Sequence, residues 1–155
     1  MSSLGRTALS PAKGDAGKMD AHWLPTLADV PLFRGLSKRH LRRIASLART
    51  RRYAAGTAIV RAGDPGTAFY VILDGTARVV PPKGRARKLH AGDFFGEMAL
   101  LDGAPRSADV FAEGEVLTMW IGQTGFGRLV KKEPALAYAL LRTLAARLRD
   151  VQSSD

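Results

Sequence analysis

The segment 94–112, FFGEMALLDGAPRSADVFA, brings together residues that could bind a sugar phosphate. Gly96 permits a tight turn and a close approach of a ligand to the backbone, and the free N–H groups at the start of a following helix favour an anion. Arg106 offers a planar fork of donors for a phosphate, and Pro105 restricts the loop that carries it. A carboxylate such as Glu97 accepts hydrogen bonds and repels anions, so it suits a sugar hydroxyl beside the phosphate.

The run FGEMALLDGAPRSADV resembles the phosphate-binding cassette of cyclic-nucleotide-binding domains, and residues 61–80 resemble the central hairpin of the same family. That module is shared by catabolite-activator-type transcription factors, cyclic-nucleotide-gated channels and regulatory subunits of cAMP-dependent kinase. The resemblance covers roughly residues 27–150. It implies that Glu97 binds the ribose 2′-hydroxyl and Arg106 the exocyclic phosphate oxygens. It also implies a cradle of groups around these two, at Gly96, Met98, Ala99, Ser107 and Ala108.

Each part of this pattern has a simpler reading. A Gly-Glu pair before an apolar helix is common, and a single loop arginine is usually a solvated surface charge. Their joint occurrence at this spacing favours a ligand site. Serine at position 107 resembles the cAMP-preferring members, so we expect cAMP rather than cGMP as the ligand, and no cofactor.

A cyclic-nucleotide site needs residues that pack against the base as well as residues that bind the phosphate. Pro134 predicts the start of a helix to about Val151, because proline is tolerated in a first turn. Its expected apolar stripe contains Leu136, Leu140, Leu141, Leu144 and Leu148. In the family, the corresponding helix moves over the bound base.

Four residues are candidates for contact with the base. Leu144 and Arg147 lie on the last helix, and the Arg147 guanidinium could stack on a purine or interact instead with the helix dipole. Val79 and Leu89 would supply an apolar wall from the strands. All four assignments are hypotheses about the same pocket.

Short apolar runs separated by Gly, Pro and Asp dominate residues 51–122 and predict strands. The expected fold is α+β but mainly β, a jelly-roll-type β-roll of about eight strands. N-terminal helices, a short helix in the cassette and C-terminal helices acting as a lid complete it. A helical segment from Asp20 is expected to be interrupted at Pro25, and Asp74-Gly75 predicts a hairpin.

The chain of 155 residues, 46% of them hydrophobic, is long enough for one core. We expect a flexible tail over residues 1–19, one domain over 20–151 and a C-terminal tail over 152–155. Absence of cysteine excludes disulfides and thiolate zinc sites. The scattered histidines predict neither a metal site nor an enzyme. Without an apolar run for a signal peptide or membrane span, a cytoplasmic location is expected.

The net charge of +10 indicates a second class of partner. Eight basic residues and no acid occur between positions 34 and 52, at Arg34, Lys38, Arg39, Arg42, Arg43, Arg49, Arg51 and Arg52. A basic face can bind nucleic acid or an anionic surface, although a solvated helix face is the simpler and favoured interpretation. The competing function is therefore a degenerate cyclic-nucleotide-binding fold that acts as an interaction module through this face.

We expect no DNA-reading helix-turn-helix after Asp155, and residues 1–155 contain no evident kinase-docking segment or membrane helix. We therefore expect a cyclic-nucleotide-operated regulatory module that acts in trans on an unidentified protein effector, as a monomer or weak homodimer. A nucleotide buffer and an excised domain of a longer protein are the alternatives.

Overall fold

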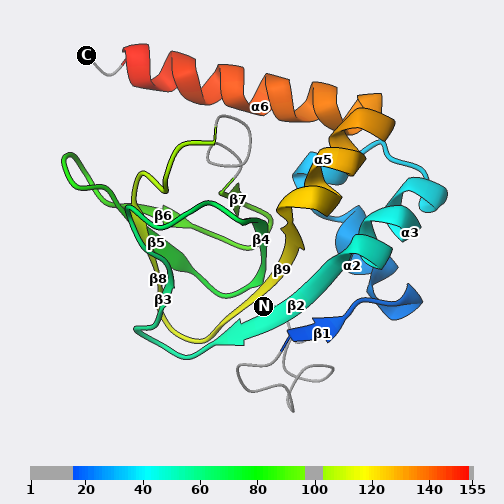
Figure 1. Cartoon of the computed structure of the whole chain (residues 1–155), viewed down its shortest axis with the longest axis horizontal. Helices are drawn as coiled ribbons and strands as arrows, with labels where there is room; N and C mark the ends of the chain where they lie inside the picture. The colour runs from blue at the N-terminus through cyan, green and yellow to red at the C-terminus, as the bar shows by residue number, and fades with distance from the viewer. Residues whose placement is uncertain (1–15, 97–102, 154–155) are drawn as a thin grey trace.

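The computed structural model describes residues 16–96 and 103–153, which form two antiparallel sheets accompanied by helices (Figure 1). In spatial order, the first sheet contains β1 (Ala16–Lys18), β2 (Ala48–Tyr53), β9 (Val116–Gly122), β4 (Ala68–Asp74) and β7 (Phe94–Phe95). The second contains β3 (Ala58–Val60), β8 (Asp109–Ala112), β5 (Ala77–Val80) and β6 (Arg87–Leu89). The predicted jelly-roll-type β-roll is confirmed.

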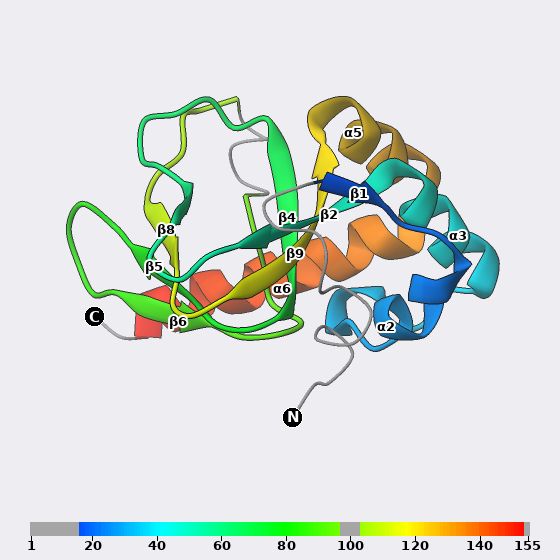
Figure 2. The same cartoon turned by 90° about the horizontal axis from the view of Figure 1, so that it is seen from below.

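Helices lie before and after the main strands. Before them come η1 (Ala21–Trp23), α2 (Leu24–Ala28), η2 (Pro31–Phe33) and α3 (Lys38–Leu47), and after them α5 (Gln123–Lys132) and α6 (Pro134–Ser153). Helices α2, α3 and α5 gather at one end of the roll, and α6 runs from that end along the roll (Figures 1 and 2). Pro25 lies in the first turn of α2, where its missing N–H is tolerated, so the predicted interruption there is wrong.

Strand β4 lies at the centre of the molecule and is covered on both faces. Phe69 and Val71 belong to a core shared with the helices, while Ile72 belongs to a second core inside the roll. Tyr70 packs against that second core. Because successive side chains of a strand point to opposite faces, the run FYVIL reads as continuously apolar in the sequence.

Ser37 begins α3 by accepting a hydrogen bond from the His40 N–H at 3.3 Å. Leu41 and Ile44 bury one face of the helix. The exposed face carries the basic residues, as its 3.6-residue periodicity predicts.

The buried stripe of α6 is narrower than predicted. Leu136 and Leu140 are buried in the helical core and Leu144 packs against it. Leu141 and Leu148 instead are 65% and 59% exposed, because the rotation of about 100° per residue places them beside the buried stripe rather than on it. The prediction of all five leucines on one packed stripe is therefore wrong for these two.

Asp74-Gly75 does not form a hairpin, since β4 and β5 belong to different sheets. Gly75 has φ +94°, and a Cβ there would lie 2.5 Å from the Glu115 carbonyl oxygen. The turn carries the chain from one sheet to the other, past the segment that connects β8 with β9.

Four of the nine strands in the described part of the chain were not predicted as strands, among them the two-residue β7. β1 falls within the expected tail of residues 1–19 and pairs with β2. β2 has the sequence ARTRRY, in which the basic residues conceal the alternation of buried and exposed positions. β6 contains the basic residues Arg87 and Lys88, which conceal its alternation. Over the described part of the chain, no helix is long and apolar enough to cross a membrane.

Candidate functional site

Arg106 is a buried cation held in one orientation. Its side chain is 7% exposed, its Nη2 donates to the Ala68 carbonyl at 2.7 Å and its Nη1 donates to the Gly96 carbonyl at 3.0 Å. The guanidinium carbon lies 5.8 Å from the centre of the Tyr70 ring. Two hydrogen bonds from one planar group restrict its rotation, so the arginine is positioned before any ligand arrives.

Gly96 is required at its position for two reasons. Its φ of +93° is a conformation that residues with a Cβ rarely adopt. A Cβ at this position would also lie 2.6 Å from Arg106 Nη1 and 2.8 Å from the Ala68 carbonyl oxygen. The sequence predicts that Gly96 makes room for a ligand, and the structure shows that it makes room for the Arg106 side chain.

The backbone of Arg106 is clamped by the loop after β3. Arg106 N–H donates to the Asp64 carbonyl at 2.8 Å, and Gly63 N–H donates to the Arg106 carbonyl at 2.9 Å. Ser107 is exposed and Ala108 packs against the core of the roll. The loop is therefore fixed on both sides of the arginine, while the Ser107 hydroxyl faces solvent.

An aromatic pair lies beside this arginine inside the roll. The Tyr70 and Phe95 rings stack with centres 4.8 Å apart and planes 6° from parallel. Val79 and Leu89 are buried in the same apolar core that Tyr70 packs against. The structure thus brings two of the base candidates to the side of the molecule that holds Arg106.

The interior of the roll also raises the pKa of a tyrosine, Tyr53. The pKa of Tyr53 is raised to about 12, chiefly because burial disfavours the phenolate. The neighbouring Tyr70 adds to this rise, while Arg51 opposes it. The Tyr53 side chain is 8% exposed, and this burial accounts for most of the rise.

The base candidates on α6 contact other groups. Arg147 Nη2 donates to the Phe94 carbonyl at 3.2 Å, and its guanidinium carbon lies 4.4 Å from the centre of the Phe94 ring. Leu144 packs against the helical core. The predicted stacking of Arg147 on a base stays a prediction, but the structure shows that this side chain can stack on an aromatic ring.

Glu97, Met98 and Ala99 lie outside the described residues, so their assigned roles remain predictions. The predicted absence of a metal site also stays a prediction. In residues 16–96 and 103–153, no three His, Asp or Glu side chains lie close enough together to hold a metal ion.

Two contributors to the site were missed in the sequence. Tyr70 lies against Arg106, and the carbonyl of Ala68 orients it. An aromatic residue in a predicted strand was a weak signal for Tyr70. No sequence signal identifies Ala68, because its contribution is a backbone carbonyl.

The cyclic nucleotide-binding domain family model matches residues 50–133, more than half of the chain. The chain belongs to this family. The match includes the strands that place Arg106, Gly96 and Tyr70, and it ends where α6 begins.

Individual relatives agree with this assignment. Glutaminase 1 of Bradyrhizobium diazoefficiens is 36% identical over 135 residues, which are 86% of this chain and 22% of that protein. The cAMP-dependent protein kinase regulatory subunit of Colletotrichum orbiculare is 38% identical over 106 residues, which are 67% of this chain and 27% of that protein. The chain spans about a quarter of the length of these curated relatives.

Among solved structures, the regulatory domain of Toxoplasma gondii PKA in complex with cAMP superposes with a TM-score of 0.71 at 29% identity. The superposition covers 81% of this chain and 49% of that one.

Proposed function

We propose that this domain is a cAMP-binding regulatory module whose phosphate anchor is Arg106. The observation that carries the proposal is the buried guanidinium, oriented by the carbonyls of Gly96 and Ala68. A desolvated and preoriented cation interacts more strongly with a phosphate than a solvated one. Family membership and the cAMP named for two of the relatives support the same ligand class.

The ligand would lie between the cassette and the interior of the roll. Ser107 presents an exposed hydroxyl next to Arg106, and Glu97 is assigned to the ribose by the resemblance. Val79 and Leu89 would form the apolar wall for the base. Serine at position 107 favours cAMP over cGMP, as in the members that it resembles.

Movement of α6 would report binding to a protein partner in trans. Arg147 links α6 to the Phe94 carbonyl, two residues before Gly96, so a displacement of the cassette acts directly on that contact. A ligand shifts the helix only by its difference in affinity between the two arrangements. Hydrogen exchange of α6 amides with and without cAMP measures this shift, and equal protection in both conditions argues against it.

The decisive experiment is calorimetric titration of cAMP and cGMP into the wild type, Arg106→Ala and Ser107→Ala. Loss of a charge-assisted hydrogen bond to phosphate should weaken cAMP binding about 10- to 150-fold in Arg106→Ala. Because Arg106 also holds the fold, melting temperatures must accompany the titrations. Ser107→Ala removes an exposed hydroxyl, so it should weaken binding without changing the melting temperature of the free protein.

Arg85→Ala is the matched control, since Arg85 is an exposed arginine in a loop outside the site. It should bind cAMP like the wild type. Absence of heat and of thermal shift with millimolar cAMP or cGMP on the folded wild type would overturn the proposal.

A further inference from the structure

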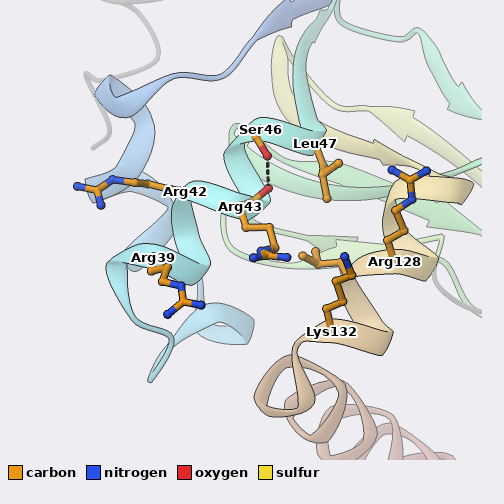
Figure 3. Close-up of a pocket in the computed structure, with 8 residues that line it drawn as sticks. Arg39, Arg42, Arg43, Ser46, Leu47, Arg128 and Lys132 are labelled. Carbon is orange, nitrogen blue, oxygen red and sulfur yellow. Dashed lines mark hydrogen bonds between the residues drawn. The ribbon is translucent and has the colours of Figure 1, made fainter.

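A second cluster of cations lines a pocket between α3 and α5, away from Arg106. The pocket has a volume of about 470 Å³. Its lining consists of five cations, one hydroxyl and two leucines, namely Arg39, Arg42, Arg43, Ser46, Leu47, Arg128, Leu129 and Lys132. In Figure 3, the guanidinium of Arg43 and the ammonium of Lys132 point toward each other across the gap between the two helices, whereas Arg42 points away from it.

The two helices approach closely at one end of this pocket. A Cβ added at Gly125 would lie 3.7 Å from Leu47, an ordinary van der Waals distance, so the first turn of α5 lies next to the end of α3. Leu129 is 1% exposed and fixes α5 in the helical core. The hollow is therefore held open by packed helices rather than by the basic side chains themselves.

Four of the five cations have no ion-pair partner among the residues that the structure describes, and these are Arg39, Arg42, Arg128 and Lys132. Arg43 pairs with Glu133, at 3.4 Å between Nε and Oε2. Ser46 Oγ donates to the Arg43 carbonyl at 2.7 Å, so its proton is engaged within its own helix. The donors that face a ligand are consequently guanidinium and ammonium groups.

We propose that this pocket binds a compact polyphosphate group. Like charges gathered around one hollow repel each other, and a polyvalent anion relieves that repulsion while accepting several charge-assisted hydrogen bonds. The shape favours a small ligand, because cations from both helices line the concavity between them. The lining of the pocket includes neither Arg106 nor any residue that contacts it, so the site is separate from the proposed nucleotide pocket.

Arg43 couples this site to the beginning of α6. The Glu133 carboxylate that holds Arg43 also accepts from His40 Nε2 at 3.0 Å, and the Glu133 carbonyl accepts the Leu136 and Ala137 N–H groups. A bound polyphosphate competes with Glu133 for Arg43. Occupancy of the pocket therefore acts on the residue from which α6 starts.

The test is calorimetric titration of tripolyphosphate at low salt into the wild type and two double variants. Arg39→Gln with Lys132→Gln removes one pocket cation from each helix. Lys38→Gln with Lys131→Gln removes the neighbouring cations from the same two helices, and neither of those lysines lines the pocket. Both double variants change the net charge equally, and all four side chains are exposed, so both should fold.

We expect the pocket variant to bind tripolyphosphate at least about tenfold more weakly than the wild type, and the control variant to bind within about threefold of it. Glu133→Gln should bind more tightly, because Arg43 loses its competing acid. Equal weakening in both double variants, or no binding by the wild type at millimolar tripolyphosphate, would overturn the proposal. So would preferential binding of a short DNA duplex that both double variants weaken alike, since that indicates a diffuse nucleic-acid surface.

Discussion

Arg106 and the cations between α3 and α5 show two ways in which one chain can hold positive charge. Arg106 is buried and its guanidinium is oriented by two backbone carbonyls. The cations of the α3–α5 pocket are mostly exposed, and of the five only Arg43 has an ion-pair partner among the described residues, Glu133. The guanidinium of Arg106 therefore has one defined orientation. The exposed cations of the pocket have defined backbone positions, but the orientation of their charged groups is much less restricted.

The two regions should therefore respond differently to substitution. A buried, oriented cation depends on every neighbour that shapes its cavity, because an unpaired buried polar group costs free energy. An exposed cluster tolerates the loss of any one member in folding and responds mainly through salt-dependent binding.

The largest effect is expected when the cavity around Arg106 is filled. Gly96→Ala should lower the free energy of unfolding by about 3 kcal/mol, since it adds both a strained φ and close contacts with Arg106 and Ala68. Gly103→Ala is the control, because Gly103 has φ +73° but no atom within 4 Å of an added Cβ. It should lose only about 1 kcal/mol in urea denaturation. Equal losses would show that crowding at Arg106 is unimportant.

A smaller effect is expected from the acid that contacts the exposed cluster. Glu133 is nearly buried while Arg43 and His40 are partly exposed, so Glu133→Gln should cost about 1 to 2 kcal/mol in urea denaturation. Glu113→Gln removes an acid paired with Arg78 at a more exposed position and should change stability less. A larger loss of unfolding free energy in Glu113→Gln than in Glu133→Gln would show that the ion pair in the roll contributes more to stability.

Alkaline titration tests whether the roll interior beside Arg106 is poorly solvated. The folded pKa of Tyr53 is about 12 and the ordinary value is 10.0, so the unfolded chain loses this proton first as the pH rises. The contribution of Tyr53 is therefore complete below pH 10 and is lost toward pH 12. Relative to Tyr53→Phe, the wild type should lose about 1 kcal/mol of stability by about pH 11. Ultraviolet difference spectra that show Tyr53 ionising near pH 10 would contradict this.

The smallest effect is expected at Arg147, a half-buried cation intermediate between the two regions. Arg147→Met removes the contacts with the Phe94 ring and carbonyl and should cost about 0.5 to 1 kcal/mol. Arg142→Met is the matched control from the same helix, because Arg142 lies over the exposed ring of Tyr138 at 6.0 Å. Thermal unfolding should separate the two variants, and identical melting temperatures would remove Arg147 as a link between α6 and β7.

The sequence predicted local features well where side-chain chemistry and periodicity agree. The start of a helix at Pro134 was predicted correctly, because it depends on neighbours in the chain. Strands β2 and β6 were missed because basic side chains conceal their alternation. The hairpin predicted at Asp74-Gly75 was wrong because a turn signal does not specify which sheet receives the next strand.

By itself, the sequence determined the family, the β-roll and the residues that could bind a phosphate, since these are written in local motifs and spacing. Only the tertiary structure decided that Gly96 makes room for Arg106, that Ala68 orients it and that α3 and α5 enclose a basic pocket. These features join residues distant in the chain through backbone carbonyls and helix packing. No local sequence pattern predicts such contacts, because which distant residues meet depends on how the strands and helices pack.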